Sequence, residues 1–141
     1  MKKVIFFLVI LVCSEISFAQ CDKTSVLSSS QTEYLDGNHT VQRTVDEKSV
    51  IEINKSEVVI THGNDQRKMI GTIKSDSCNW KNPFKEGKSI IKVTFTRDGE
   101  KAMNATITIE GKDEKVSFFV EIEEMPDKKI RVMADKFEEK I

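Results

Sequence analysis

The sequence predicts an all-β protein in which about eight strands form an antiparallel, lipocalin-like meander, closed as a small barrel or packed as a sandwich. Three observations support this prediction. Apolar and polar residues alternate through much of the chain, turn-forming residues separate the alternating runs, and the connections are too short to hold crossover helices. The chain has 141 residues and is 38% hydrophobic, which is enough for one domain with a buried core.

The second half of the chain shows the alternation most clearly. Four runs, at residues 90–97, 102–110, 115–122 and 129–135, place apolar side chains at every second position. Such runs are typical of strands that bury one face and expose the other. Most of the inward side chains are mid-sized aliphatics without a polar group, so we expect a filled interior. The inward positions are Ile91, Val93, Phe95, Met103, Ala105, Ile107, Ile109, Val116, Phe118, Val120, Ile122, Ile130, Val132 and Ala134.

The first half of the chain is less regular. Gly71 interrupts one alternating run, which indicates a bulge or a close approach of the backbone to another segment. At the C-terminus, residues 130–141 also fit the apolar stripe of a helix, so a terminal strand and a terminal helix both stay open. The strands expected in the first half are 24–30, 40–45, 50–53, 57–61 and 68–75, with a turn at residues 36–38.

The first nineteen residues predict a secretory signal peptide. Lys2 and Lys3 supply a positive start, an apolar run of ten residues extends from Val4 to Cys13, and Ala19 ends a small-residue cleavage pattern before Gln20. The apolar run is too short to cross a hydrocarbon core of about 30 Å. We therefore expect an exported, periplasmic or extracellular protein whose single domain spans residues 20–141.

Two cysteines, Cys21 and Cys78, remain after cleavage of the signal peptide. An even pair in an oxidising compartment predicts one disulfide. The alternative is a lipid anchor on Cys21, which would leave Cys78 alone, so the two interpretations exclude each other. Gln20 and Phe18 fit lipid attachment poorly, because that modification requires a small residue directly before the cysteine and a leucine-like residue three before it.

The composition argues against several classes of function. The formal net charge is −1, so there is no overall basic field for nucleic acid, and no later stretch is apolar enough to span a membrane. The sequence contains no glycine-rich phosphate loop, no serine elbow and no zinc-binding spacing. We expect no cofactor, no metal and no catalytic residue, and we expect His39 and His62 to be solvated loop residues.

The segment 78–87 is the least ordinary part of the chain, because it contains the only tryptophan and one of the two prolines. Trp80 and Phe84 offer apolar surface beside Lys81 and Lys85. One interpretation is a lid or recognition loop, in which these four residues form a binding rim. The other is structural: Trp80 plugs one end of the barrel, and the proline shapes the turn.

Several segments resemble those of small exported bacterial proteins with no assigned function. They are residues 71–73, 77–81, 83–88, 107–112 and 130–137. The meander also resembles lipocalin-like domains, although the Gly-x-Trp strand that opens typical lipocalins is absent. These resemblances imply a fold, and they bring no catalytic residues, since a shared fold does not establish a shared function.

Two classes of function therefore stay open. The first is a non-enzymatic binding or envelope-associated module that acts through its outer surface or through the rim around Trp80 and Phe84. Its partner would be another envelope protein or a small apolar ligand. The second is a small secreted hydrolase whose site is assembled from scattered Asp, Glu, Ser and His residues.

Overall fold

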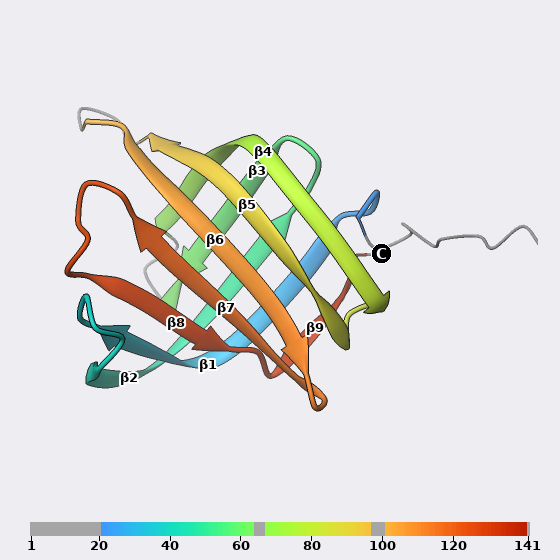
Figure 1. Cartoon of the computed structure of the whole chain (residues 1–141), viewed down its shortest axis with the longest axis horizontal. Helices are drawn as coiled ribbons and strands as arrows, with labels where there is room; N and C mark the ends of the chain where they lie inside the picture. The colour runs from blue at the N-terminus through green and yellow to red at the C-terminus, as the bar shows by residue number, and fades with distance from the viewer. Residues whose placement is uncertain (1–20, 64–66, 97–100, 141) are drawn as a thin grey trace, which may run out of the picture.

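A computed structural model describes residues 21–63, 67–96 and 101–140. This part of the chain forms a closed antiparallel barrel of eight strands plus one extra strand, with no α-helix (Figure 1). The predicted all-β meander is confirmed, and the structure selects the barrel over the sandwich. The strands are β1 (Ser25–Leu35), β2 (Val41–Ile53), β3 (Glu57–His62), β4 (Arg67–Asn82), β5 (Glu86–Thr96), β6 (Met103–Lys112), β7 (Lys115–Ile122), β8 (Lys129–Met133) and β9 (Lys136–Glu139).

Strand β1 closes the barrel. Each strand from β1 to β7 pairs with the next along the chain, and β1 also pairs through its other edge with both β8 and β9. Residues 32–35 of β1 lie opposite β8, whereas residues 25–28 lie opposite β9. The strands β8 and β9 therefore act as two halves of one interrupted strand along the edge of β1.

The structure corrects one pair of strands predicted from the sequence and decides two alternatives that the sequence left open. Residues 40–45 and 50–53 are not separate strands, because β2 continues through the polar residues between them by pairing with β1 across a register shift. The segment 78–87 is not a loop, since β4 and β5 pair almost to their ends and leave only residues 83–85 as a turn. The C-terminus forms a strand, because residues 136–139 pair with β1.

The interior is filled by apolar side chains. Every second-half position predicted to point inward is buried or half-buried, and Phe118, Leu27 and Ile51 are among the largest fully buried side chains. A space among the core side chains measures about 30 Å³, and a second space, beside the disulfide, measures about 40 Å³. Since one water needs roughly 10–15 Å³ of such volume, these spaces admit only a few waters, in agreement with the predicted filled interior.

Gly71 allows a core ring to pack directly on the backbone of β4. It pairs with Phe95 of β5, and a Cβ at this position would lie 2.8 Å from Cε1 of the Phe95 ring. That distance is shorter than a carbon–carbon contact of about 3.5–4.0 Å. The close approach predicted from the sequence is therefore the reason for a glycine inside this strand.

The two ends of the barrel carry different connections (Figure 1). The turns after β2, β4 and β6, at residues 54–56, 83–85 and 113–114, lie at one end, which we call the plugged end. The connections 36–40 and 123–128, which follow β1 and β7, lie at the opposite end, which we call the open end. In Figure 1 the connections of the open end are at the left, and the turns after β4 and β6 are at the lower right.

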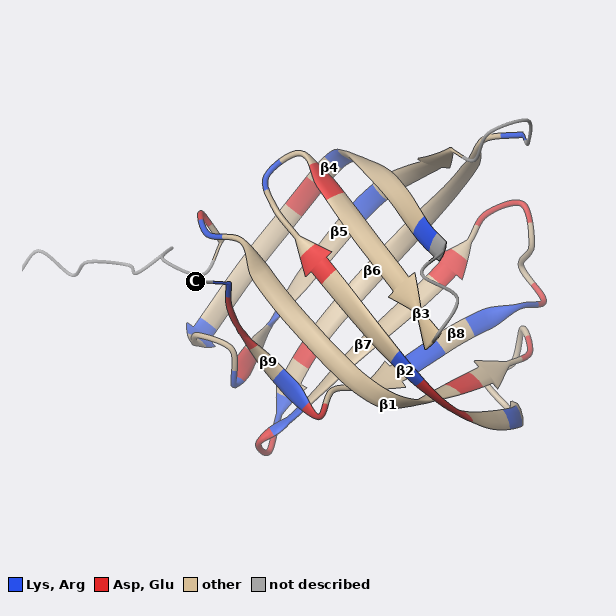
Figure 2. Ribbon diagram, turned by 180° about the vertical axis from the view of Figure 1, so that it is seen from behind, with Lys and Arg blue, Asp and Glu red and all other residues tan. Residues whose placement is uncertain are grey.

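No helix in the described residues is long and apolar enough to cross a membrane. The predicted signal peptide, residues 1–19, lies outside the described residues. Positively and negatively charged residues are interspersed along the strands and connections (Figure 2). The distribution of charge therefore does not distinguish one face of the barrel as a functional surface. Local shape and the pairing of individual charges are more informative.

Candidate functional site

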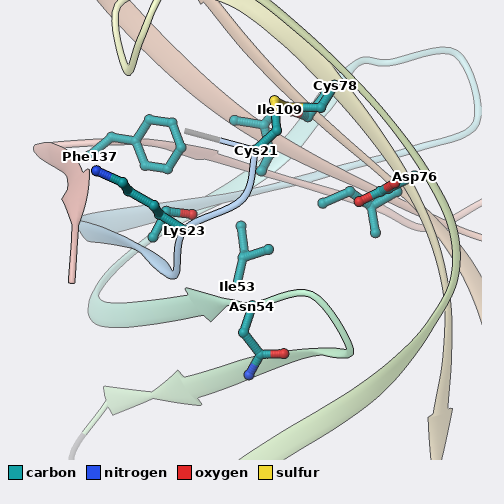
Figure 3. Close-up of a pocket in the computed structure, with 11 residues that line it drawn as sticks. Cys21, Lys23, Ile53, Asn54, Asp76, Cys78, Ile109 and Phe137 are labelled. Carbon is teal, nitrogen blue, oxygen red and sulfur yellow. A yellow bond between two sulfur atoms is a disulfide. The ribbon is translucent and has the colours of Figure 1, made fainter. Parts of the chain in front are cut away.

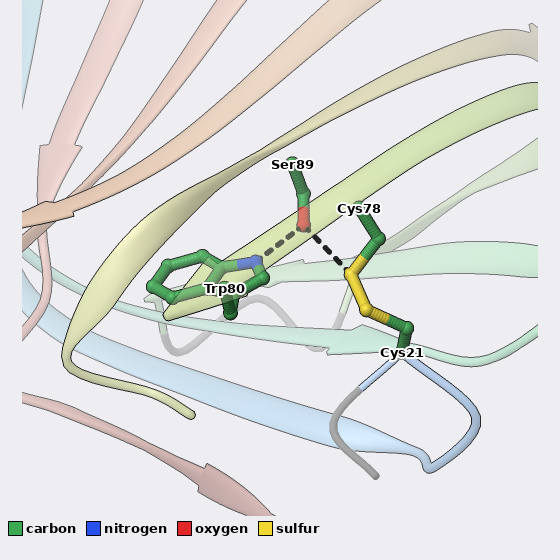
Figure 4. Close-up of a disulfide and its surroundings, with 4 residues drawn as sticks. All are labelled: Cys21, Cys78, Trp80 and Ser89. Atoms are coloured by element: carbon green, nitrogen blue, oxygen red, sulfur yellow. Dashed lines mark hydrogen bonds between the residues drawn. A yellow bond between two sulfur atoms is a disulfide. The ribbon is translucent and has the colours of Figure 1, made fainter. Parts of the chain in front are cut away.

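The predicted disulfide between Cys21 and Cys78 is confirmed, and it ties the N-terminal segment to β4 (Figure 4). The two cysteines are 57 positions apart in the sequence, and their Cα atoms are 6.1 Å apart. Ser89 of β5 donates its hydroxyl hydrogen to Sγ of Cys78 at 3.4 Å and accepts the indole N–H of Trp80 at 2.8 Å. The disulfide and the tryptophan are thus joined through one buried serine.

Trp80 packs across the plugged end. Its ring centroid lies 5.8 Å from that of Phe137 on β9, and the Phe84 ring lies 5.0 Å from the same phenylalanine. Gly111 also approaches the indole, since a Cβ there would lie 2.7 Å from Cζ3 of Trp80. Trp80 and Phe84 are half-buried. These contacts support the structural interpretation, in which Trp80 closes one end of the barrel.

The proposed rim at this end has little room for a ligand. Lys81 and Lys85 are exposed, whereas the two aromatic rings pack on Phe137. The nearby space of about 40 Å³ lies beside the disulfide and is partly walled by Lys23 and Asp76 (Figure 3). A space of this size is far below the roughly 300 Å³ of a small-molecule site. Binding at the rim stays a prediction.

The open end contains a much larger cleft, of about 550 Å³. It lies between the β1–β2 hairpin and the β7–β8 hairpin. These two hairpins are neighbours because β1 pairs with β8. Apolar side chains from both hairpins form much of its wall. The lining residues are Tyr34, Leu35, Asp36, Gln42, Arg43, Ile122, Met125, Asp127, Lys128, Lys129 and Ile130.

Arg43 and Tyr34 form the central polar feature of this cleft. They are cross-strand partners on β2 and β1, and Cζ of Arg43 lies 4.4 Å from the centroid of the Tyr34 ring. The Tyr34 hydroxyl donates a hydrogen bond of 3.0 Å to Oε1 of Glu47. The carboxylate therefore fixes the ring, and the ring supports the guanidinium by a cation–π contact.

Below the cleft, polar side chains from β1, β2 and β3 form a strip, made of Thr32, Tyr34, Glu47, Ser49 and His62. Ser49 is 1% exposed, and its Oγ lies 3.3 Å from Nδ1 of His62. Among the described residues, Thr32 Oγ1 is buried and has no hydrogen-bond partner. His62 is therefore not the loop residue predicted from the sequence, because β3 extends to it and its side chain lines the inner space of about 30 Å³.

Ser49, His62 and Glu47 do not have the geometry of a hydrolytic triad. In a triad, the serine and the carboxylate contact opposite nitrogens of the histidine. Here Oε1 of Glu47 lies 4.0 Å from Nδ1 of His62, the same nitrogen that Ser49 approaches. Ser49 is also closed off from solvent. This cluster of Ser, His and Glu within the described chain thus lacks the arrangement that nucleophilic catalysis requires.

His39 is the exposed turn residue that the sequence predicts. Its backbone φ is 63°, and it belongs to the tight connection in which Asp36 accepts the N–H groups of Asn38 and Thr40, each at 2.9 Å. No group of three or more His, Cys, Asp or Glu side chains in the described residues could hold a metal ion. The features that distinguish the cleft are therefore its apolar wall and Arg43.

The environment of Tyr34 predicts a measurable pKa. Burial raises the pKa of Tyr34 above its ordinary value of 10.0, the hydrogen bond and charge of Glu47 raise it further, and Arg43 opposes them. Tyr34 is the only tyrosine, so the near-ultraviolet absorbance of phenolate reports it alone. We expect a native midpoint above 10.0, lowered by Glu47→Gln and unchanged by Asp46→Asn on the same strand.

The direction of this shift also sets a pH dependence. A raised pKa means that the folded state favours the neutral phenol, so the associated stability is complete below pH 10.0 and is lost as the pH rises through the folded-state pKa. Tyr34→Phe should remove this alkaline loss from the unfolding curve. A native midpoint at or below 10.0 would show that the ring is not buried against Glu47.

Comparison with protein-family models, with curated proteins and with solved structures finds no match for this chain. Sequence reasoning named Trp80 and Phe84 as site residues because they are conspicuous, and it missed Tyr34 and Arg43. Their side chains meet only through the pairing of β1 with β2. The signal that was present is the single tyrosine of the chain, close to a predicted turn.

Proposed function

We propose that the protein is a non-enzymatic binding module that takes a small, largely apolar molecule in the cleft at the open end. The observation that carries this proposal is the asymmetry of the barrel. One end is occupied by the disulfide and by the packed rings of Trp80 and Phe137, whereas the other opens into a cleft of about 550 Å³. This asymmetry favours the open end over the plugged end as the position of a ligand.

The size and chemistry of the cleft support this proposal. Small-molecule sites usually measure about 300–1,000 Å³ and combine mostly apolar walls with a few polar groups. Leu35, Ile122, Met125 and Ile130 provide apolar surface here, and Arg43 provides a cation supported from beneath by Tyr34. At the plugged end, the space that Phe137 lines within the described residues measures only about 40 Å³.

The filled interior supports a ligand position in the cleft rather than inside the barrel. The space inside the barrel nearest the open end measures about 30 Å³ and shares Ile122 and Ile130 with the wall of the cleft. It can hold a few waters and cannot hold a hydrocarbon chain. The ligand would therefore rest between the two hairpins, above the side chains that pack the core.

We also propose that the protein acts outside the cytoplasm. The support for export is the charged, apolar and small-residue pattern of the first nineteen residues, together with the disulfide, which forms in oxidising compartments. Because the sulfur of Cys21 is bonded to Cys78, the structure favours a free, periplasmic or extracellular protein over one that is lipid-anchored at Cys21.

Binding of the uncharged fluorescent dye Nile red tests the location of the site. Met125→Lys places a charge in the apolar wall of the cleft, and we expect it to weaken binding about tenfold or more, since burying an unpaired charge is costly. Met133→Lys is the matched control, because Met133 is 39% exposed and lies outside the cleft. It should change the dissociation constant less than about twofold.

A second variant examines the plugged end. Phe84→Ala removes one ring of the rim, and we expect it to leave the binding of Nile red unchanged. If Phe84→Ala abolishes binding while Met125→Lys has no effect, the site is at the plugged end and the proposal is wrong. If Nile red does not bind the native protein at micromolar concentrations, the cleft is not a site for apolar molecules.

A further inference from the structure

Some of the charged side chains that line the cleft already bind other groups of the protein, and others do not. Asp36 accepts two backbone N–H groups and the side-chain amide of Gln42, so its carboxylate serves the turn. Lys129 lies 3.0 Å from Oε1 of Glu121 and 3.1 Å from Nε2 of His39. Of the five charged side chains in the lining, these two are occupied by groups of the protein itself.

The three that remain are two cations, Arg43 and Lys128, and one carboxylate, Asp127. Within the described chain, no carboxylate forms an ion pair with Arg43, whose guanidinium lies over the face of Tyr34. A guanidinium stacked on a ring keeps its N–H groups at the edges of its plane, where they can donate. The cleft thus presents a cation that lies on an aromatic ring beside an apolar wall.

We infer that the ligand of this cleft is an amphipathic carboxylate, whose carboxylate group binds the guanidinium of Arg43 and whose apolar part contacts Ile122, Met125 and Ile130. This inference rests on the proposed function, and it adds the chemical class of the ligand. Arginine suits this role because its paired N–H groups match the two oxygens of a carboxylate, and such charge-assisted bonds are stronger than neutral ones.

Tyr34 acts as a positioning residue in this arrangement. The hydroxyl of Tyr34 is held by Glu47 at 3.0 Å, which fixes the ring on which the guanidinium lies. The carboxylate of Glu47 thus accepts a hydrogen bond from Tyr34, its neighbour in the polar strip. A long side chain such as arginine loses rotamer freedom when it binds, so a ring that holds it in place in advance lowers the cost of binding.

The test compares 11-(dansylamino)undecanoic acid with its methyl ester, which has the same apolar body and no charge. We expect the native protein to bind the acid about tenfold or more tightly than the ester near pH 8, where the acid is ionised. Arg43→Gln should reduce that preference to within about twofold, because only the acid carries a charge that the guanidinium can bind. Arg131→Gln is the control, since Arg131 already pairs with Glu33 at 2.6 Å and lies outside the cleft.

Two variants of Tyr34 separate positioning from folding. Tyr34→Phe keeps the ring under Arg43 and should retain the preference for the acid. Tyr34→Leu removes the ring and should lower the ratio of acid to ester affinity several-fold. If both tyrosine variants bind the acid as the native protein does, Tyr34 does not position Arg43.

The outcomes distinguish this inference from the proposed function. If acid and ester bind the native protein equally, with Met125→Lys weakening both, the cleft is a binding site and the carboxylate assignment is wrong. If Arg43→Gln keeps the full preference for the acid, another cation binds the carboxylate and the assignment to Arg43 is wrong. If neither probe binds, both the inference and the proposed function are wrong.

Discussion

Replacing Phe118 with alanine is expected to lower the free energy of unfolding by about 3–5 kcal/mol. Phe118 is 1% exposed and pairs across the barrel wall with Ile109 on β6 and Val132 on β8. Its ring also borders the inner space of about 30 Å³, so truncation would enlarge an existing gap that the surrounding strands cannot close. Urea unfolding with an unchanged slope measures the effect.

Phe119 provides the matched control for this substitution. It is the next residue on β7, so its side chain points to the opposite face of the sheet. Phe119 is half-buried, with its ring centroid 5.2 Å from that of His39. Phe119→Ala should therefore cost about 1 kcal/mol. Equal losses for the two alanine variants would mean that the barrel interior is not the main source of stability.

Loss of the disulfide is expected to lower the free energy of unfolding by up to about 4 kcal/mol, the value that loop-closure entropy assigns to a loop of this length. The bridge joins residues 57 positions apart and connects the N-terminal segment to β4. Cys78→Ser, Cys21→Ser and reduction of the native protein should all have similar effects in urea unfolding, because each removes the same cross-link.

Free thiols in the oxidised protein would contradict the disulfide. Thiol titration of the oxidised protein should find neither Cys21 nor Cys78 reactive. Two reactive thiols, or a Cys78→Ser variant as stable as the native protein, would contradict the bridge or its contribution. Nile red binding at the open end should survive moderate reduction, since the cleft and the space beside the disulfide share no lining residue.

The meander could be predicted from the sequence because each strand carries its own pattern. Residues such as Ala105, Ile107 and Ile109 alternate with polar neighbours, and hairpin connections follow from the short turns between the runs. The close approach at Gly71 could also be predicted, because a glycine inside a strand usually marks a bulge or a backbone that another group approaches closely. These features depend on local sequence alone.

Closure of the barrel could not be predicted in the same way. It depends on pairing between β1 and β8, whose ion pair of Glu33 with Arg131 joins residues 98 positions apart. The first half of the chain also lacks a clear alternating pattern, because β2 carries charged and polar residues along its exposed part. Only its pairing with β1 and β3 makes it one continuous strand.

The candidate site could not be predicted from the sequence either, because it also depends on the pairing of strands. Trp80 is the only tryptophan and was therefore predicted as a site residue. Its indole N–H donates to Ser89 and its ring packs on Phe137, so both its polar and its apolar groups contact the protein itself. Arg43 and Tyr34 are ordinary residues in weakly patterned segments. They become a candidate site only when the register places one over the other at the mouth of a cleft.

We propose that binding occurs at the open end of the barrel, and chemical-shift mapping of the amide groups can locate the bound ligand. The isotopically labelled protein would be titrated with 11-(dansylamino)undecanoic acid. We predict that the largest shifts cluster on Tyr34, Arg43, Met125 and Ile130, which line the cleft. Shifts that cluster instead on Trp80, Lys81, Phe84 and Lys85 would contradict the claim and place the site at the plugged end.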